Sequence, residues 1–184
     1  MEFKGLRINI IILVIGIVLL SFFTGQHLLK IYNIDKPLKE ELLAIDEINE
    51  LRLVDNNGKT DIYVSFKPET NFYQVYKEIE DISSKQLGNK RGKIIIMNEP
   101  SRELEELYYK MHYAIYEGLT TNEFVKMEKN VSKIVKNYQL SDYKLWVDNQ
   151  AVYLQLVNKE DSLYRRIPKN QVVSIRVEGD DVNG

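Results

Sequence analysis

The sequence IYVSFKPETNFYQVYKEIEDISSKQLGNKRGKIIIM (residues 62–97) decides the fold class of this chain. It starts with a short apolar run, residues 62–66, which predicts a strand. Residues 71–87 then place apolar side chains at helical spacing, and Gly88 stands where it would end that helix. The uninterrupted apolar run Lys93–Met97 predicts a buried strand. Strand, helix and strand in this order predict one βαβ crossover.

A tight turn is predicted just before this unit. Asn57-Gly58 lies between the apolar run Leu51–Val54 and the run at residues 62–66. Asn-Gly accommodates the positive φ angles of a two-residue hairpin turn. The first two strands are therefore expected to pair as a β-hairpin.

Two further helices are predicted after the crossover. Ser101 is a good N-cap residue, acidic side chains follow it in the first turn, and Gly118 is placed to end the helix. Thr120-x-x-Glu123 matches a capping box, which predicts the start of a third helix that runs to about Tyr138.

The last part of the domain has the pattern of an antiparallel meander. Valine, tyrosine and leucine alternate with polar residues, so we expect strands with one solvent-exposed face. The predicted strands are Tyr143–Asp148, Val152–Val157 and Ser162–Ile167, with a possible last strand at Val172–Val177.

The N-terminal region predicts a membrane anchor. Residues 8–29 carry no formal charge, and such a run matches the hydrocarbon core of a bilayer, which takes about 20 helical residues. Its end has no A-x-A-like cleavage site, so an uncleaved signal anchor is expected. Lys4, Arg7 and the short tail favour a cytoplasmic N-terminus and an extracytoplasmic domain, although lysines just beyond the run weaken the charge asymmetry.

The predicted fold class is α+β. An N-terminal single transmembrane helix is followed by a mostly antiparallel sheet with three helices, in the order stalk helix-β-β-α-β-α-α-β-β-β. The predicted parts are a transmembrane signal anchor (1–29), a helical juxtamembrane stalk (30–50), a globular domain (51–178) and a flexible tail (179–184). Asp35 and Pro37 provide the start signal of the stalk helix, and Leu38, Leu42 and Ile45 recur on one face of it.

Composition excludes several functional classes. The 184 residues contain no cysteine, which excludes thiol catalysis, disulfides and cysteine-bound metals. The 25 basic and 27 acidic side chains give no basic field for a nucleic acid. His27 and His112 lack a second ligand at zinc-site spacing. Serine-hydrolase and phosphate-loop motifs are also missing from the sequence. We therefore expect no enzyme activity, no cofactor and no metal.

Two sets of side chains are candidate interaction surfaces. They are Tyr109, Tyr113 and Tyr116 on the second helix, and Lys126, Lys129, Lys133 and Lys136 on the third. Tyrosine offers a large contact area with a polar tip, and a lysine face can lie against anionic lipid or an acidic polymer. The alternatives are a second helix packed on all sides and a lysine face that is merely solvated.

These features together predict a single-pass envelope protein that contacts the lipid bilayer through residues 8–29. Its extracytoplasmic domain would bind or assemble with other envelope proteins. One alternative is a pseudopilin-like subunit, because Lys4-Gly5 before the apolar run resembles a short basic leader. The acid expected five residues later is replaced by Ile10, however. The other alternative is a ligand-sensing regulatory domain with a pocket between the second helix and the sheet.

Overall fold

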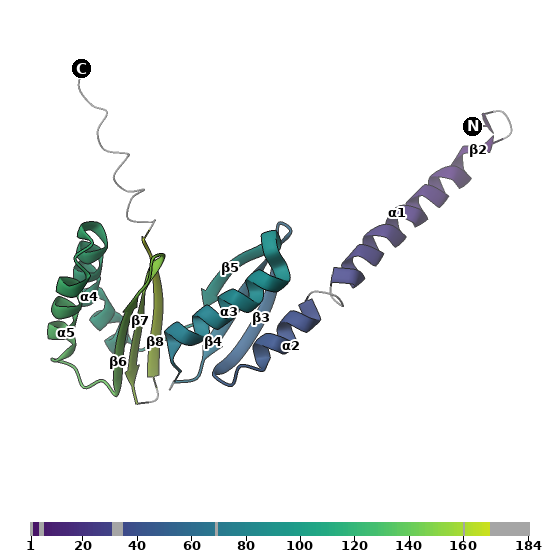
Figure 1. The fold of residues 1–184 in the computed structure, drawn as a ribbon. Helices are drawn as coiled ribbons and strands as arrows, with labels where there is room; N and C mark the ends of the chain where they lie inside the picture. The colour runs from purple at the N-terminus through teal and green to yellow at the C-terminus, as the bar shows by residue number, and fades with distance from the viewer. Residues whose placement is uncertain (1, 4–5, 31–34, 69, 160, 170–184) are drawn as a thin grey trace, which may run out of the picture.

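The computed structural model of the chain describes residues 2–3, 6–30, 35–68, 70–159 and 161–169 and has an α+β fold. Two three-stranded sheets and their covering helices form the domain (Figure 1). The order of elements from the stalk helix to the third C-terminal strand is the predicted one. The strands form two separate sheets, however, where the sequence predicted one.

The predicted hairpin opens the first sheet. Strands β3 (Ile48–Asn56) and β4 (Lys59–Phe66) pair antiparallel. Asn57 and Gly58 connect them with φ angles of 54° and 78°. These positive angles are the ones that an Asn-Gly turn tolerates at low cost, which confirms the prediction.

The predicted βαβ crossover completes this sheet. Helix α3 (Phe72–Leu87) leads through a short 3₁₀ turn, η2 (Gly88–Lys90), into β5 (Arg91–Ile96). Strand β5 pairs parallel with β4. The Asn71 side chain accepts a hydrogen bond from the Gln74 backbone at the start of α3.

The helix before the first sheet is shorter than the predicted range of 30–50. Helix α2 covers Lys36–Leu43, and residues 44–47 form a turn before β3. Leu38 and Leu42 are fully buried in the core that α2 shares with α3. The helix ends at Leu43 because β3 begins at Ile48, where the backbone is already extended and paired with Phe66.

The second sheet contains the three C-terminal strands in antiparallel order β6-β7-β8. These strands are β6 (Asp142–Val147), β7 (Ala151–Asn158) and β8 (Asp161–Pro168). Helices α4 (Arg102–Thr121) and α5 (Phe124–Val135) pack together and cover one face of this sheet (Figure 1).

The predicted break between α4 and α5 is misplaced. Gly118 lies inside α4, where an added Cβ would come within 2.5 Å of the Cβ of Met127 in α5. The glycine therefore allows the two helices to approach closely. Asn122, with φ 59°, ends α4 instead. The predicted capping box is wrong, because the Thr120 hydroxyl donates to the Tyr116 carbonyl within α4.

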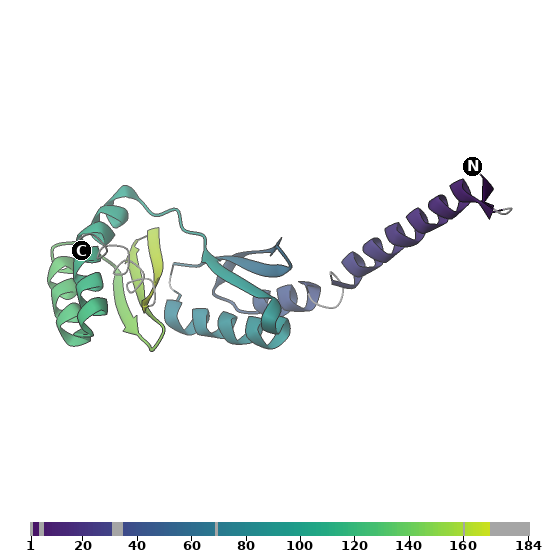
Figure 2. The same ribbon diagram turned by 90° about the horizontal axis from the view of Figure 1, so that it is seen from above.

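Strand β7 is buried on both faces, in contrast to the predicted meander with one exposed face. Ala151 and Tyr153 pack into the core that contains α2 and α3. Val152, Leu154 and Leu156 alternate with them and pack against α4 and α5. The second sheet thus lies between the α4–α5 pair on one side and α3 with the first sheet on the other (Figure 2).

Helix α1 (Ile8–Lys30) lies apart from both sheets in Figures 1 and 2. The two-residue strands β1 (Glu2–Phe3) and β2 (Leu6–Arg7) pair just before it. Within the part of the chain that the structure describes, no helix is both long and apolar enough to cross a membrane, so the structure does not support the predicted transmembrane helix. The predicted last strand at 172–177 and the tail at 179–184 lie outside the described residues.

Candidate functional site

The tyrosines of α4 separate into exposed and packed side chains. Tyr109 and Tyr113 are 64% and 65% exposed. Their rings meet edge to face at 5.8 Å, and their hydroxyl oxygens are 3.1 Å apart. Tyr116 stacks on His112 at 4.2 Å and packs against the core beneath α4. The stripe expected from the sequence is therefore an exposed pair next to one packed ring.

The opposite face of α4 explains why this pair points outward. Leu104, Leu107, Met111 and Ile115 recur at helical spacing and are fully buried against the second sheet. Tyr109 and Tyr113 are four residues apart on the other side of the helix, where i and i+4 side chains are neighbours. The packing of one face thus fixes the pair in solvent.

The four lysines of the α5 region are all exposed. Lys126 is held by two carboxylates, that of Glu117 at 2.7 Å and that of Glu123 at 3.2 Å. The hydrogen bond to Glu117, followed by the one to Glu123, raises the pKa of Lys126. Lys129, Lys133 and Lys136 extend the exposed basic row. We call these four lysines, together with Tyr109, Tyr113 and Tyr116, the α4–α5 surface.

A second feature, which the sequence did not predict, is a cavity of about 550 Å³ between the two sheets. It opens between β5 and β8, each of which is an edge strand of its own sheet. Its walls include Tyr76 and Glu80 of α3, Arg91, Ile94 and Ile96 of β5, and Tyr164 and Arg166 of β8. We call this cavity the β5–β8 cleft.

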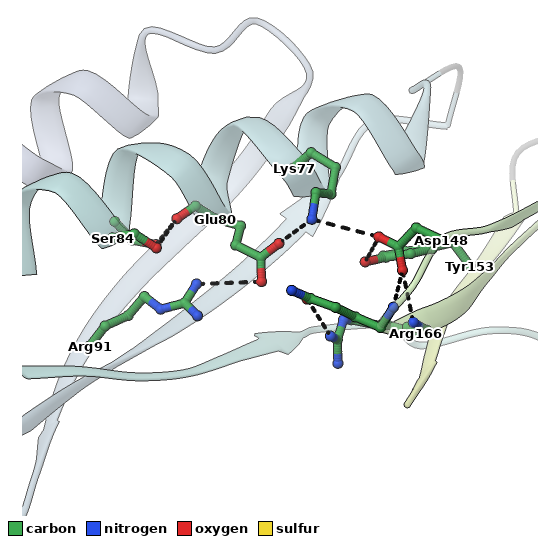
Figure 3. A network of polar contacts seen from close by, with 10 residues as sticks. Lys77, Glu80, Ser84, Arg91, Asp148, Tyr153 and Arg166 are labelled. Carbon is green, nitrogen blue, oxygen red and sulfur yellow. Dashed lines mark hydrogen bonds and ion pairs between the residues drawn. The ribbon is translucent and has the colours of Figure 1, made fainter. Parts of the chain in front are cut away.

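Glu80 lies at the centre of the charges along one wall of the cleft. Its carboxylate is 2.5 Å from the Lys77 ammonium and 3.6 Å from the Arg91 guanidinium (Figure 3). Lys77 also reaches toward Asp148, 3.6 Å away on the turn after β6. The hydrogen bond to Glu80 raises the pKa of Lys77. Glu80 is therefore already neutralised from two sides.

The Asp148 carboxylate is also satisfied within the protein, by hydrogen bonds from its own turn and from Tyr153. It accepts hydrogen bonds of 2.8 Å from the backbone N–H groups of Gln150 and Ala151, and one of 3.1 Å from the Tyr153 hydroxyl. Burial alone would raise the pKa of Asp148, but these hydrogen bonds lower it overall. Burial also raises the pKa of Tyr153 to about 12, so its hydroxyl stays protonated as a donor.

Arg166 differs from the other charged groups because it has no ion pair among the described residues. Its guanidinium lies over the rings of Tyr76 and Tyr153, 5.5 Å and 5.9 Å from their centres. One nitrogen lies at 3.5 Å from the Gln150 side-chain oxygen, and its buried Nε has no hydrogen-bond partner. Nη1 of Arg91 is also buried without a hydrogen bond. The cleft therefore contains buried guanidinium N–H groups that make no hydrogen bond among the described residues.

Asn98 lines the cleft and is bonded to the edge strand β8. Its side-chain oxygen accepts from the Tyr164 backbone N–H at 3.0 Å, and its amide donates to the Tyr164 carbonyl at 2.8 Å. The Tyr164 hydroxyl lies 2.9 Å from the Lys67 carbonyl oxygen and 3.0 Å from that of Pro68. These contacts join the end of the first sheet to the edge of the second.

Sequence reasoning missed Arg166, although a signal was present. Arg165-Arg166 interrupts an apolar strand, and neighbouring side chains of a strand point to opposite faces. Arg165 pairs with Glu105 of α4 at 2.7 Å, whereas Arg166 lies over the rings of Tyr76 and Tyr153, and both arginines line the cleft. Two adjacent arginines in a strand indicate a buried polar site only when both faces of that strand are known to be covered.

The described residues contain no group of three histidine or carboxylate side chains placed to hold a metal ion. A scan against protein-family models found no match, and searches of curated proteins and of solved structures found none either. Any functional argument therefore depends on the α4–α5 surface and the β5–β8 cleft themselves.

Proposed function

We propose that this chain is a single-pass membrane-anchored envelope protein whose extracytoplasmic domain binds other envelope proteins through the α4–α5 surface. The main support for this proposal is the exposed pair Tyr109 and Tyr113, which lies on a helix whose opposite face is buried in the core. Aromatic side chains are enriched at protein interfaces because they bury a large area at low entropic cost. Two adjacent rings joined through their hydroxyls already have a fixed relative orientation.

The lysine row supports a partner with acidic groups. Lys126 is compensated by Glu117 and Glu123, and Lys129, Lys133 and Lys136 continue the exposed row beyond it. Charges at the rim of an interface steer association and fix orientation more than they add affinity. The tyrosine pair would therefore anchor the partner, and the lysines would orient it.

The exposure of α1 supports the anchor, which would need the whole uncharged run of residues 8–29, because the described part of the helix is not by itself long and apolar enough to cross a membrane. All described side chains of this helix, residues 10–22, are exposed, and they include Ile12, Leu13 and Leu20 at 64%, 63% and 74%. A contiguous apolar surface of this kind requires an apolar environment. We propose that a bilayer provides it, with the short basic tail on the cytoplasmic side.

A photo-crosslinking amino acid at position 113 tests the interaction in intact cells. We expect a protein adduct after illumination when the crosslinker replaces Tyr113, and none when it replaces Val54, an exposed residue of β3. Substituting Lys129 and Lys133 by glutamate should weaken the adduct without unfolding the domain, since both side chains are exposed. Equal adducts at positions 113 and 54, or a detergent-solubilised protein that is purely monomeric and partner-free, would rule out this surface.

A further inference from the structure

We propose that the β5–β8 cleft binds a small organic anion, with its carboxylate or phosphate group held by Arg91 and Arg166 and its apolar part against Ile94 and Ile96. This site is independent of the α4–α5 surface, since the cleft lies between the two sheets and α4 and α5 lie on the far face of the second sheet. The argument depends on charge, unused donors and shape.

The charge around the cleft favours an anion. The charged side chains that line the cleft are Glu80 from α3, Arg91 and the exposed Lys93 from β5, and Arg165 and Arg166 from β8, and Arg165 is paired with Glu105 of α4. Lys77 and Asp148 join this set through their ion pairs with Glu80 and with each other. Glu80 and Asp148 are both taken up by partners within the protein. No described carboxylate lies within ion-pair distance of Arg166, although Glu80 is close enough to interact with its charge, so basic groups outnumber acidic ones in the lining of the cleft.

The unused donors have the chemistry of an oxyanion site. Nε of Arg166 is buried without an acceptor, and Nη1 of Arg91 is buried without a hydrogen bond, 3.6 Å from the Glu80 carboxylate. A buried donor without an acceptor is destabilising, and a guanidinium can hold a carboxylate or a phosphate through two parallel hydrogen bonds. The rings of Tyr76 and Tyr153 fix the Arg166 side chain. Such pre-organisation reduces the entropy lost on binding.

The size and lining of the cleft suit a small ligand. Its volume of about 550 Å³ lies within the roughly 300–1,000 Å³ that small-molecule sites occupy. Ile94 and Ile96 are partly buried and provide an apolar wall. Asn98 also lines the cleft, where its two hydrogen bonds to the Tyr164 backbone hold its side chain in place.

Isothermal titration calorimetry on the full chain in a non-ionic detergent tests the proposal. The probes are inorganic phosphate, hexanoate and, as a neutral control, hexan-1-ol. We expect at least one anion to bind and hexan-1-ol not to bind. Hexanoate binding would identify a carboxylate with an apolar body, and phosphate binding alone would identify a phosphate group.

Two arginine substitutions, one in the cleft and one outside it, make the test specific. Arg166→Gln should raise the Kd of the bound anion about tenfold or more, because it removes a charged donor group. Arg102→Gln is the matched control, since Arg102 lies on α4 outside the cleft and pairs with Glu106. It should leave the Kd within about twofold, well below the tenfold that one charged contact represents.

Three outcomes would overturn the site. These are the absence of anion binding to the unaltered chain at millimolar concentration, unchanged binding by Arg166→Gln, and an equal loss in Arg102→Gln. Thermal unfolding followed by circular dichroism checks that each variant folds. Arg166→Lys provides a second reading if Arg166→Gln does not fold, because lysine keeps the charge and loses the planar fork, and binding should again weaken. These outcomes leave crosslinking at position 113 unaffected, so the two proposals fail separately.

Discussion

The two sheets have the same number of strands but differ in what covers them. In the first sheet, β3 exposes Arg52 and Val54 on one face and buries Leu51 on the other. In the second sheet, β7 is buried at every position from Ala151 to Val157. The difference shows that the layer in which a strand lies, more than its own pattern, decides how much of it meets water.

Strand β7 also joins the two cores of the domain. Tyr153 meets the rings of Phe72, Tyr73 and Tyr76 of α3 at 6.0 Å, 5.0 Å and 5.5 Å between centres. Leu154, the next residue, belongs to the core under α4 and α5. A substitution on either face of β7 therefore disturbs a packed core, whereas a substitution at an exposed position of β3 does not.

Among the substitutions that test this difference between the sheets, truncation of a leucine in β7 is expected to lower the free energy of unfolding most. Leu154→Ala should lower the free energy of unfolding by about 3 kcal/mol, because Leu154 is fully buried and its removal leaves a cavity. Val54→Ala, at a side chain 42% exposed, should change it by no more than about 0.5 kcal/mol. Urea denaturation of both variants measures the difference. Similar losses in both would mean that the two sheets are equally protected.

A smaller loss is expected for the one polar side chain in the middle of β7. Gln155 accepts a hydrogen bond from the Phe72 backbone N–H at 3.1 Å and donates to Asp142 at 2.9 Å. Gln155→Ala should therefore lower the unfolding free energy by about 2 kcal/mol, because it leaves a buried donor unpaired.

Asn49→Ala in β3 is the matched amide control for this substitution. Its side chain donates a 3.5 Å hydrogen bond to Ser65 at the surface, so we expect a loss of no more than about 0.5 kcal/mol. The same urea midpoints provide the measurement. An unchanged midpoint for Gln155→Ala would show that water or another group satisfies the Phe72 N–H.

The smallest effect is expected at the buried carboxylate of the first sheet. Asp61 accepts from the Asn56 side chain at 2.9 Å and from the Lys93 backbone at 2.7 Å, and these two bonds lower its pKa below the ordinary value of 3.8. Because the folded pKa is the lower one, the stabilisation is present above about pH 4 and is lost as the pH falls through the folded value.

Asp61→Asn should therefore lose about 1 kcal/mol at pH 7, the size of one hydrogen bond, and should lose less stability than the unaltered chain on acidification. Urea denaturation at pH 7 and pH 3 measures both effects. An acid dependence identical to that of the unaltered chain would show that Asp61 does not contribute to it.

The order of helices and strands could be read from the sequence because its signals are local. Asn57-Gly58 forms the turn it predicts, Ser101 caps α4, and Gly88 ends α3. Each of these depends on residues within one turn of the chain. The same local rules failed at Gly118, whose role is set by Met127 on the next helix.

The division into two sheets could not be read in this way, because it depends on contacts between distant residues. The Gln155 side chain is satisfied by the Phe72 backbone, 83 residues away along the chain. Without that partner, its polarity suggests a solvent-exposed face, which is what the meander pattern predicted. The hydrogen bond from the distant Phe72 backbone therefore allows Gln155 to be buried, although its polarity alone predicts exposure.

The candidate sites show the same limit. Helical spacing could place Tyr109, Tyr113 and Tyr116 together but could not show that only the first two are mainly exposed. Arg91 and Arg166 lie on strands that the sequence treated as unrelated. The edges of two sheets bring them to one cleft, and no spacing along the chain encodes that meeting.

The hydrogen bond between Asn98 and Tyr164 makes it possible to measure how often the two sheets separate transiently. The backbone amide of Tyr164 is protected from solvent exchange by a side chain on the connection that follows β5, not by a neighbouring strand. Separation of the two sheets would release that single proton while the strand pairs within each sheet stay intact. The deuterium uptake of this one amide therefore reports how often the cleft opens, independently of whether the domain unfolds.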